Sequence, residues 1–342
     1  MFSKILVVGL GSIGSRHLRL LRQLHPAAEI AVLRHQVHSQ PIEFADHVFS
    51  DQRAALSFRP ECAVIANPAP FHVSIASHLV AIGCHVLIEK PLSAHSEGLA
   101  ELKSLAEARN VVVQVGYNLR FLSSLCRFRQ LIVSGEIGRV FSIRCEIGQA
   151  LPSWRPGTDF RQGVSARKEL GGGVLLELSH ELDYLRWIFG EIAWVNAWTG
   201  QLSGLGLEVE DTAHLILSFE GHHGEAVGVL SMDFARADTT RQCVAIGTAG
   251  SLRWNAMTGT VERLVSGDDL WGQVFEQLPA RDASYAAQWQ DFVATVKVNA
   301  SPSISIDDGW AVVNLVEAAK ASAAQGGARV RVAPVGKRLD DE

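Results

Sequence analysis

Short apolar runs alternate with amphipathic stretches through the first third of the chain. Between residues 4 and 115 the runs ILVVG, EIAVLR, ECAVIA, HVLIE and VVVQVG are separated by segments with helical character. Near-continuous apolar strands joined by amphipathic helices are typical of a parallel sheet covered on both faces. The pattern therefore predicts a doubly wound α/β domain over residues 1–120.

The pattern changes after Arg120, where strand-like runs follow one another without regular intervening helices. Several of these runs alternate polar and apolar residues across short turns, which indicates a large, mostly antiparallel open sheet with one exposed or partner-covered face. Such a face commonly serves assembly. We therefore expect residues 121–342 to form a second, α+β domain. The runs are RVFSIRCEI, AWVNAWTG, DTAHLILSFEG, EAVGVLSMDFA, RQCVAIGT, SLRWNAM and GTVERLV.

Composition narrows the class of protein. The 342 residues suit two domains, and 47% hydrophobic and 20% charged residues are ordinary globular values. The net charge of −5 makes nucleic acid an unexpected partner. Apolar runs are broken well before 18 residues and the start lacks the features of a signal peptide, so we expect a cytoplasmic protein that does not enter membranes. The five cysteines are scattered, which predicts reduced thiols and no metal site.

A glycine-rich turn follows the first apolar run. The segment GLGSIG spans residues 9–14 and precedes the helical stretch SRHLRLLRQL. In the dinucleotide-binding pattern, Gly9 permits the tight turn, Gly11 lets a pyrophosphate approach the backbone, and Gly14 allows close helix packing. The helix amino terminus, at Ser12 and Ile13, favours the phosphate charge. We therefore expect this segment to bind NAD or NADP.

Three further positions at predicted strand ends are candidates for cofactor binding. The second run closes on Arg34 without an acidic residue, which favours NADP over NAD because an arginine can pair with the 2′-phosphate. Arg34 could also be a solvated loop cation. Asn67 and His72 follow the run ECAVIA, where ligands of open α/β sheets bind. His72 could equally cap or pack its helix.

The next strand ends in Glu89-Lys90-Pro91, where a lysine can reach a cofactor crevice and donate a proton; the alternative is a surface ion pair between Glu89 and Lys90. This motif resembles the glucose/fructose oxidoreductase and inositol 2-dehydrogenase family, known as Gfo/Idh/MocA. The resemblance extends over essentially the whole chain through GYNLRF (116–121), SWRPG (153–157) and LGGGVLLELSHELDYLRWIFG (170–190).

The resemblance implies roles for several side chains. Lys90 and His180 match the family's acid/base pair, and Asp183 matches an acidic residue that follows the histidine and is a candidate for substrate contact. The family commonly has an aspartate four residues before that histidine, whereas this chain has Leu176 there and Glu177 one position later. Glu177 is therefore a candidate replacement. Glu89 and Asn118 belong to family-like motifs at which we expect cofactor contact, and Asn118 is also a candidate for substrate contact.

Two other stretches bear on the candidate site. Helical spacing predicts a helix from about Val174, with Glu177, His180 and Tyr184 on a polar face that faces either solvent or a pocket. Beside it lies an apolar stripe formed by Leu178, Leu182, Leu185 and Phe189. Trp154 and Arg155 belong to a loop with further cations, and this combination suits a sugar ring that carries an anionic group. The alternative is a connecting loop whose charges keep it in solution.

The resemblance implies an NAD(P)-dependent oxidoreductase that transfers hydride between nicotinamide and a hydroxyl or carbonyl carbon of a sugar, sugar acid or nucleotide sugar, with NADP favoured. The resemblance is strongest toward family members that are associated with the sugar pathways of surface polysaccharides. The alternatives are an NAD-dependent glycosidase of the same family and a non-catalytic NADP-binding sensor. The family also implies a homodimer or homotetramer that assembles through the second-domain sheet.

Overall fold

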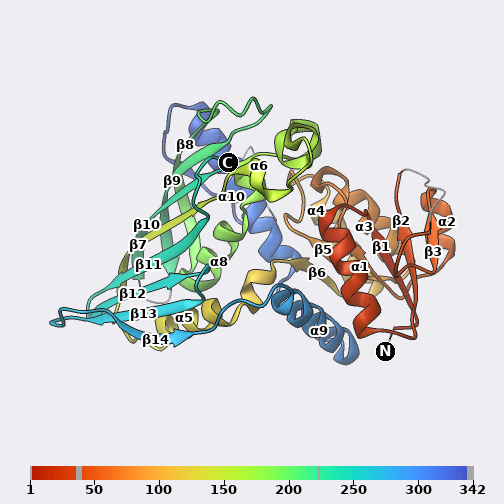
Figure 1. Ribbon diagram of the computed structural model, residues 1–342, viewed down its shortest axis with the longest axis horizontal. Coiled ribbons are helices and arrows are strands. Elements are labelled where there is room, and N and C mark those ends of the chain that lie inside the picture. The colour runs from red at the N-terminus through yellow and green to blue at the C-terminus, as the bar shows by residue number, and fades with distance from the viewer. Residues whose placement is uncertain (1, 36–40, 222–223, 337–342) are drawn as a thin grey trace. The chain divides into compact units, whose positions relative to one another are not determined.

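The computed structural model describes residues 2–35, 41–221 and 224–336, which divide into two compact units (Figure 1). The first unit runs to Tyr117 and takes in Tyr285–Val313, and the second consists of Asn118–Ser284 and the chain from Asn314 onward. The sequence pattern places residues 285–313 in the second domain instead. They belong to the first unit because Trp289 and Phe292 are part of its hydrophobic core.

The first unit contains a parallel sheet of six strands in the order β3-β2-β1-β4-β5-β6. This order is that of a doubly wound dinucleotide-binding domain, and it confirms the predicted α/β class. The order reverses between β1 and β4, which is where such sheets bind ligands. The strands are β1 (Lys4–Val8), β2 (Glu29–Leu33), β3 (His47–Phe49), β4 (Cys62–Ile65), β5 (His85–Glu89) and β6 (Val113–Gly116).

Helices pack against this sheet because its strands are apolar on both faces. In β1, β2 and β4 the side chains are almost all buried, and Trp289 and Phe292 of α9 complete one face of the core. The helices with residues in this unit are α1 (Ser12–Leu24), α2 (Gln52–Ser57), α3 (His72–Ala81), α4 (Leu99–Arg109), α9 (Ala283–Val298) and the first turns of α10 (Ile306–Ala324).

The second unit is built on a nine-stranded sheet in the order β14-β13-β12-β11-β7-β10-β9-β8-β15. Its pairings are antiparallel except that between β7 and β10, which confirms the predicted, mostly antiparallel sheet. The strands are β7 (Val140–Gly148), β8 (Glu191–Gly200), β9 (Thr212–Gly221), β10 (Gly224–Asp233), β11 (Thr240–Gly247), β12 (Gly250–Asn255), β13 (Thr260–Val265), β14 (Gly272–Glu276) and β15 (Val330–Arg331).

One face of this sheet is buried beneath helices and the other is exposed. Alternate side chains of β10 are buried and exposed, as expected for a sheet covered on one side. Tyr184 of α8 reaches Cys145 of β7, and Trp254 of β12 donates to Ser124 of α5. Figure 1 shows these helices on one side of the strands. The helices are α5 (Ser123–Val133), α6 (Leu151–Trp154), α7 (Val174–Glu177), α8 (His180–Phe189) and the rest of α10, with the 3₁₀ turns η2 (Asn118–Phe121), η3 (Phe160–Gln162), η4 (Val164–Ala166) and η5 (Lys168–Leu170).

The helix expected to start at Val174 is interrupted. Helix α7 ends at Glu177, and α8 begins at His180 after a break at Leu178 and Ser179. The prediction of one continuous helix is therefore wrong, although Leu178, which continues the apolar stripe, is buried. As a consequence, Glu177 ends one helix while His180 opens the next.

Candidate functional site

The glycine-rich turn forms a narrow backbone cradle between β1 and α1. Gly9 adopts a φ of +86°, and a Cβ there would lie 2.7 Å from the backbone nitrogen of Asn67. A Cβ at Gly14 would lie 2.1 Å from the carbonyl oxygen of Gly9, so only glycine fits at either position. At Gly11, by contrast, a Cβ would meet no atom within 4 Å. The turn is packed tightly on one side and open at Gly11.

The amino terminus of α1 at this turn has no side-chain cap. Gly11 is the N-cap residue, so no side-chain oxygen accepts from the first backbone N–H groups of the helix. These N–H groups and the helix dipole favour a negatively charged group. The residues of the cradle thus fit the pyrophosphate of a dinucleotide.

Two other predicted residues lie at the carboxyl ends of strands in the first unit. The backbone N–H of Arg34, directly after β2, donates to the Phe49 carbonyl. Asn67 follows β4, and its buried Oδ1 accepts no hydrogen bond from the described part of the chain. A buried amide oxygen without a donor is costly, so it suits a ligand that donates to it. Both positions are compatible with the predicted cofactor contacts.

His72 and Glu89 have partners within the protein itself. The His72 ring is buried, with Nε2 2.7 Å from the Asn67 carbonyl oxygen and Nδ1 3.0 Å from the Pro91 carbonyl oxygen. Burial lowers the pKa of His72, while these carbonyl contacts act in the opposite direction. Glu89 is also buried, and His17 of α1 donates from Nε2 to its Oε1 at 2.6 Å. The sequence left open whether His72 contacts the cofactor or caps or packs its helix, and in the structure its ring nitrogens contact two backbone carbonyl oxygens.

Lys90 is the half-buried residue between Glu89 and Pro91. It directly follows β5, at the sheet edge where ligands bind in this fold. The interpretation of Glu89 and Lys90 as a surface ion pair is not supported for Glu89, which is buried against His17.

In the second unit, two ion pairs hold the first turn of α8, which begins at His180. Arg120 of η2 binds Asp183 through two hydrogen bonds, of 2.9 Å and 2.6 Å, and both side chains are buried. Arg241 of β11 donates to the fully buried Glu181 at 2.7 Å. His180 itself is 9% exposed. The two arginines fix the helix turn that carries His180.

Asp183, a candidate for substrate contact, has an internal partner. Both of its carboxylate oxygens accept hydrogen bonds from Arg120. The pair combines residues 63 positions apart, and a spacing of this kind carries no local signal. Arg120 lies inside the GYNLRF motif, so the sequence singled out this segment but did not indicate which residue Arg120 binds. Asn118 of the same motif donates to the Ser284 hydroxyl at 2.8 Å.

Glu177 and Tyr184, on the predicted polar face, lie in different environments. Glu177 is half-buried and accepts a hydrogen bond from Ser165 at 3.0 Å. Tyr184 is fully buried against Cys145, and burial raises the pKa of its phenol well above the usual range. Glu177 is therefore a half-buried polar group close to His180 in the chain, whereas Tyr184 belongs to the core.

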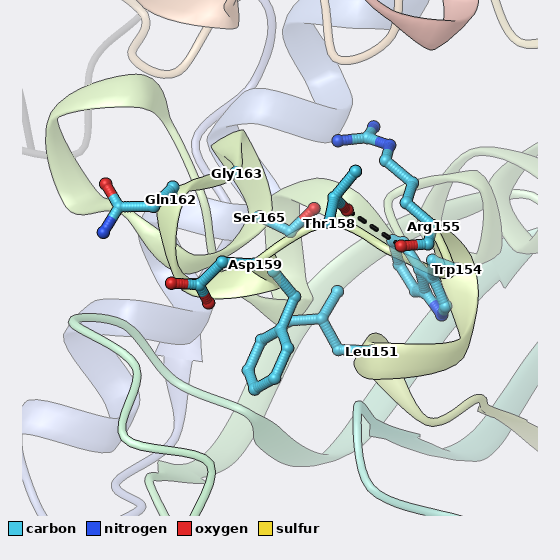
Figure 2. Close-up of a pocket in the computed structure, with 9 residues that line it drawn as sticks. Leu151, Trp154, Arg155, Thr158, Asp159, Gln162, Gly163 and Ser165 are labelled. Carbon is cyan, nitrogen blue, oxygen red and sulfur yellow. Dashed lines mark hydrogen bonds between the residues drawn. The ribbon is translucent and has the colours of Figure 1, made fainter.

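A pocket of about 390 Å³ lies in the second unit beside α6 and η3. Its lining includes Trp154 and Arg155, and Figure 2 shows Thr158 bonded to the Arg155 carbonyl while the guanidinium extends away from it. Ser165 also lines the pocket and connects it to Glu177 through its hydroxyl. The lining residues are Leu151, Trp154, Arg155, Thr158, Asp159, Phe160, Gln162, Gly163 and Ser165.

Two other cations of this loop have protein partners. Arg161 donates to the Leu205 carbonyl and lies over the Phe160 ring, and Arg167 pairs with Glu169. Arg155 is thus the cation among the residues that line this pocket, opposite in charge to Asp159. Within the described ranges, no group of three or more acidic, histidine or cysteine side chains is arranged to hold a metal ion. No described helix is long and apolar enough to cross a membrane.

Comparison with known proteins identifies both units. Residues 3–117 match the family model described as "Oxidoreductase family, NAD-binding Rossmann fold", and residues 126–253 match the "GFO/IDH/MocA C-terminal domain". Among curated relatives, the rhizopine catabolism protein MocA of Rhizobium meliloti is 26% identical over 190 residues, which cover 54% of this chain and 56% of that protein. The match therefore spans little more than half the length of that relative.

Other relatives match over longer stretches. The 1,5-anhydro-D-fructose reductase of Ensifer adhaerens is 29% identical over 250 residues, 70% of this chain and 71% of that protein. Among solved structures, GenD2 from gentamicin A biosynthesis in complex with NAD is 28% identical with a TM-score of 0.78, covering 96% of each chain. Levoglucosan dehydrogenase in complex with NADH and levoglucosan has the same fold, with a TM-score of 0.83 at 22% identity, and covers 97% of this chain and 99% of that one. The two matched models and these relatives establish that the chain belongs to the Gfo/Idh/MocA family of oxidoreductases.

Proposed function

We propose that this protein is an NAD(P)-dependent dehydrogenase or reductase of a carbohydrate. The observation that carries the proposal is the uncapped start of α1 beside Gly11, where the backbone leaves room for a pyrophosphate and presents N–H groups to it. A bound nicotinamide would supply the hydride acceptor or donor. The chain itself must bind that cofactor, orient the sugar and move one proton.

Lys90 and His180 are the proposed acid/base groups. In the oxidative direction one of them accepts the proton of the substrate hydroxyl, and in the reductive direction the same group returns a proton to the alkoxide. Glu177 is proposed to bind a substrate hydroxyl in place of the displaced family aspartate.

The substrate is proposed to be a sugar, sugar acid or nucleotide sugar. Relatives named for 1,5-anhydro-D-fructose, inositol and levoglucosan support a small carbohydrate. The pocket beside α6 supports it as well, since Trp154 offers an apolar ring face and Arg155, Asp159 and Gln162 offer polar groups around it. An aromatic face with a few polar groups is the usual lining of a small-ligand pocket.

We further propose that NADP is preferred over NAD. The support is Arg34 after β2, where no acidic residue is present to accept from the ribose hydroxyls. The solved relatives named above were bound to NAD or NADH. Arg34→Ala is expected to weaken NADP binding by about tenfold, equivalent to roughly 1.4 kcal/mol, with NAD binding unchanged. Equal affinity of the unaltered protein for both cofactors would remove the preference.

The experiment that tests the main proposal is a substrate panel of neutral sugars, inositols, sugar acids and nucleotide sugars. Each is assayed with NAD and NADP by absorbance at about 340 nm, where the reduced nicotinamide absorbs. Lys90→Ala and His180→Ala are expected to lower turnover on the substrate found by about 10²- to 10⁴-fold. Full turnover by both variants would contradict the assigned roles.

The second unit is also proposed to mediate self-association into a dimer or tetramer. Its exposed sheet face carries the large apolar side chains Trp198, Ile216, Val227 and Val229, each more than 40% exposed. Val229 lies directly opposite Ile216 across β10 and β9, so these two side chains form an apolar patch that spans both strands.

A further inference from the structure

Two buried histidines from different helices hold the residues on either side of Lys90. On one side, His17 of α1 donates to the Glu89 carboxylate at 2.6 Å, and these side chains are 2% and 7% exposed. On the other side, the His72 ring of α3 lies 3.0 Å from the carbonyl oxygen of Pro91. Lys90 therefore lies between two neighbours, Glu89 and Pro91, each of which is contacted by a buried histidine.

The Glu89 anchor is rigid because several elements enclose it. A Cβ on Gly116 of β6 would lie 3.1 Å from the Glu89 Cα and 3.2 Å from its carboxylate, so the neighbouring strand packs directly on it. Tyr285 of α9 lies edge-on to the His17 ring, with 5.7 Å between the ring centroids. A hydrogen bond to an ionised carboxylate in such a closed setting is stronger than an exposed one.

The same histidines connect this turn to the glycine cradle. His17 lies on α1, the helix whose amino terminus forms the cradle. His72 contacts the Asn67 carbonyl through its second nitrogen, and the Asn67 backbone packs directly on Gly9. Both anchors therefore join the Lys90 turn to the segment proposed to hold the cofactor phosphates.

We propose that His17 and His72 are positioning residues for Lys90, which fix its backbone relative to the cofactor cradle without touching the substrate. The proposal rests on the proposed function of Lys90. Acid/base catalysis requires the reacting group to be held to a fraction of an ångström, and a displacement of about 1 Å can cost on the order of 100-fold in rate. A side chain on a short turn needs such anchors because its own strand ends one residue earlier.

The variants separate this role from a general contribution to stability. His17→Ala removes the anchor, whereas His17→Gln keeps an N–H donor for Glu89. The matched control is His25→Gln, which alters another buried histidine at the end of the same helix, one that accepts from Trp289 instead of contacting the turn.

The first measurement needs no activity. Hydrogen–deuterium exchange is followed in the peptide that covers residues 86–95. His17→Ala is expected to accelerate exchange there by at least tenfold, equivalent to about 1.4 kcal/mol, while His17→Gln and His25→Gln leave it close to wild type. Unchanged exchange in His17→Ala would overturn the anchor, whether or not a substrate has been found.

The second measurement tests whether the anchor acts through Lys90. His17→Ala is expected to lower kcat by about 10- to 100-fold with little change in the fluorescence-titrated affinity for the reduced cofactor. In a Lys90→Ala background the same substitution should cause no further loss, because the group it positions is gone. Full additivity of the two losses would contradict the proposal. Absence of turnover in the unaltered protein would count against the proposed function instead and leave the exchange result standing.

Discussion

Arg120 donates to both carboxylate oxygens of Asp183, from Nε at 2.9 Å and from Nη2 at 2.6 Å, inside the second unit. The side chains are 6% and 1% exposed, so each charge depends on the other for its stabilisation. The contact fixes helix α8 to the turn η2 one helical turn after His180. It is a structural support for the candidate site.

Breaking this ion pair is expected to destabilise the protein strongly. Arg120→Ala or Asp183→Asn should lower the free energy of unfolding by about 3–5 kcal/mol, because an uncompensated charge or polar group remains buried. Chemical denaturation monitored by tryptophan fluorescence measures the loss. Arg236→Ala serves as the control, since its ion pairs with Asp238 and Glu146 are exposed and should cost less than about 1 kcal/mol. Equal losses of unfolding free energy in Arg120→Ala and Arg236→Ala would contradict this account.

Two glycines of the cradle are expected to respond differently to alanine. Gly14→Ala should destabilise the fold by about 1–3 kcal/mol, since the new Cβ meets the Gly9 carbonyl at 2.1 Å. Gly11→Ala should leave the melting temperature nearly unchanged, because no atom lies within 4 Å of its Cβ. It should nevertheless weaken cofactor binding by tenfold or more, about 1.4 kcal/mol. Thermal melts and fluorescence titration distinguish the two. Wild-type affinity in Gly11→Ala would show that the pyrophosphate does not approach there.

Stability is expected to fall as the pH is lowered from 7 to 5, in part through His72. Burial lowers the pKa of His72 in the folded chain below its usual 6.5. In the pH range between the folded and the unfolded pKa, the unfolded chain therefore binds a proton that the folded chain does not. Stability is therefore fully present above about pH 6.5 and declines below it, with a slope of up to about 1.4 kcal/mol per pH unit from this group. Burial shifts the pKa values of His25 and His85 in the same direction.

The contribution of His72 is measured by repeating denaturation at several pH values. His72→Gln should flatten the slope, whereas His78→Gln, an exposed histidine on the same helix, should not. An identical slope in His72→Gln and the unaltered protein would assign the pH dependence to other groups.

Introducing a charge on the exposed sheet face is expected to weaken self-association. Val229→Asp places a carboxylate in the patch beside Ile216, where a second copy would have to bury it. Light scattering coupled to size exclusion should show a smaller species. Leu270→Asp is the control, because Leu270 is 82% exposed and lies between strands β13 and β14. A mass that is the same before and after Val229→Asp would rule out this face as the interface.

Local patterns determined much of this protein. Apolar runs identified both sheets and the doubly wound α/β class, and the glycine turn identified the cradle at Gly9 to Gly14. They could do so because strand periodicity and turn conformation depend on neighbouring residues. The motifs around Lys90 and His180 marked the candidate site through their resemblance to a family. The break between Glu177 and His180 was missed, since the apolar spacing continues across it.

Only the tertiary structure decided which side chains support those motifs. His17 and Glu89 are 72 positions apart, and Arg241 and Glu181 are 60 apart, yet each pair is in hydrogen-bond contact. Asp183, a candidate for substrate contact, likewise binds Arg120, 63 positions away. Such partners come from distant elements that meet only when the fold assembles, and each buried polar group depends on the partner that the fold brings to it.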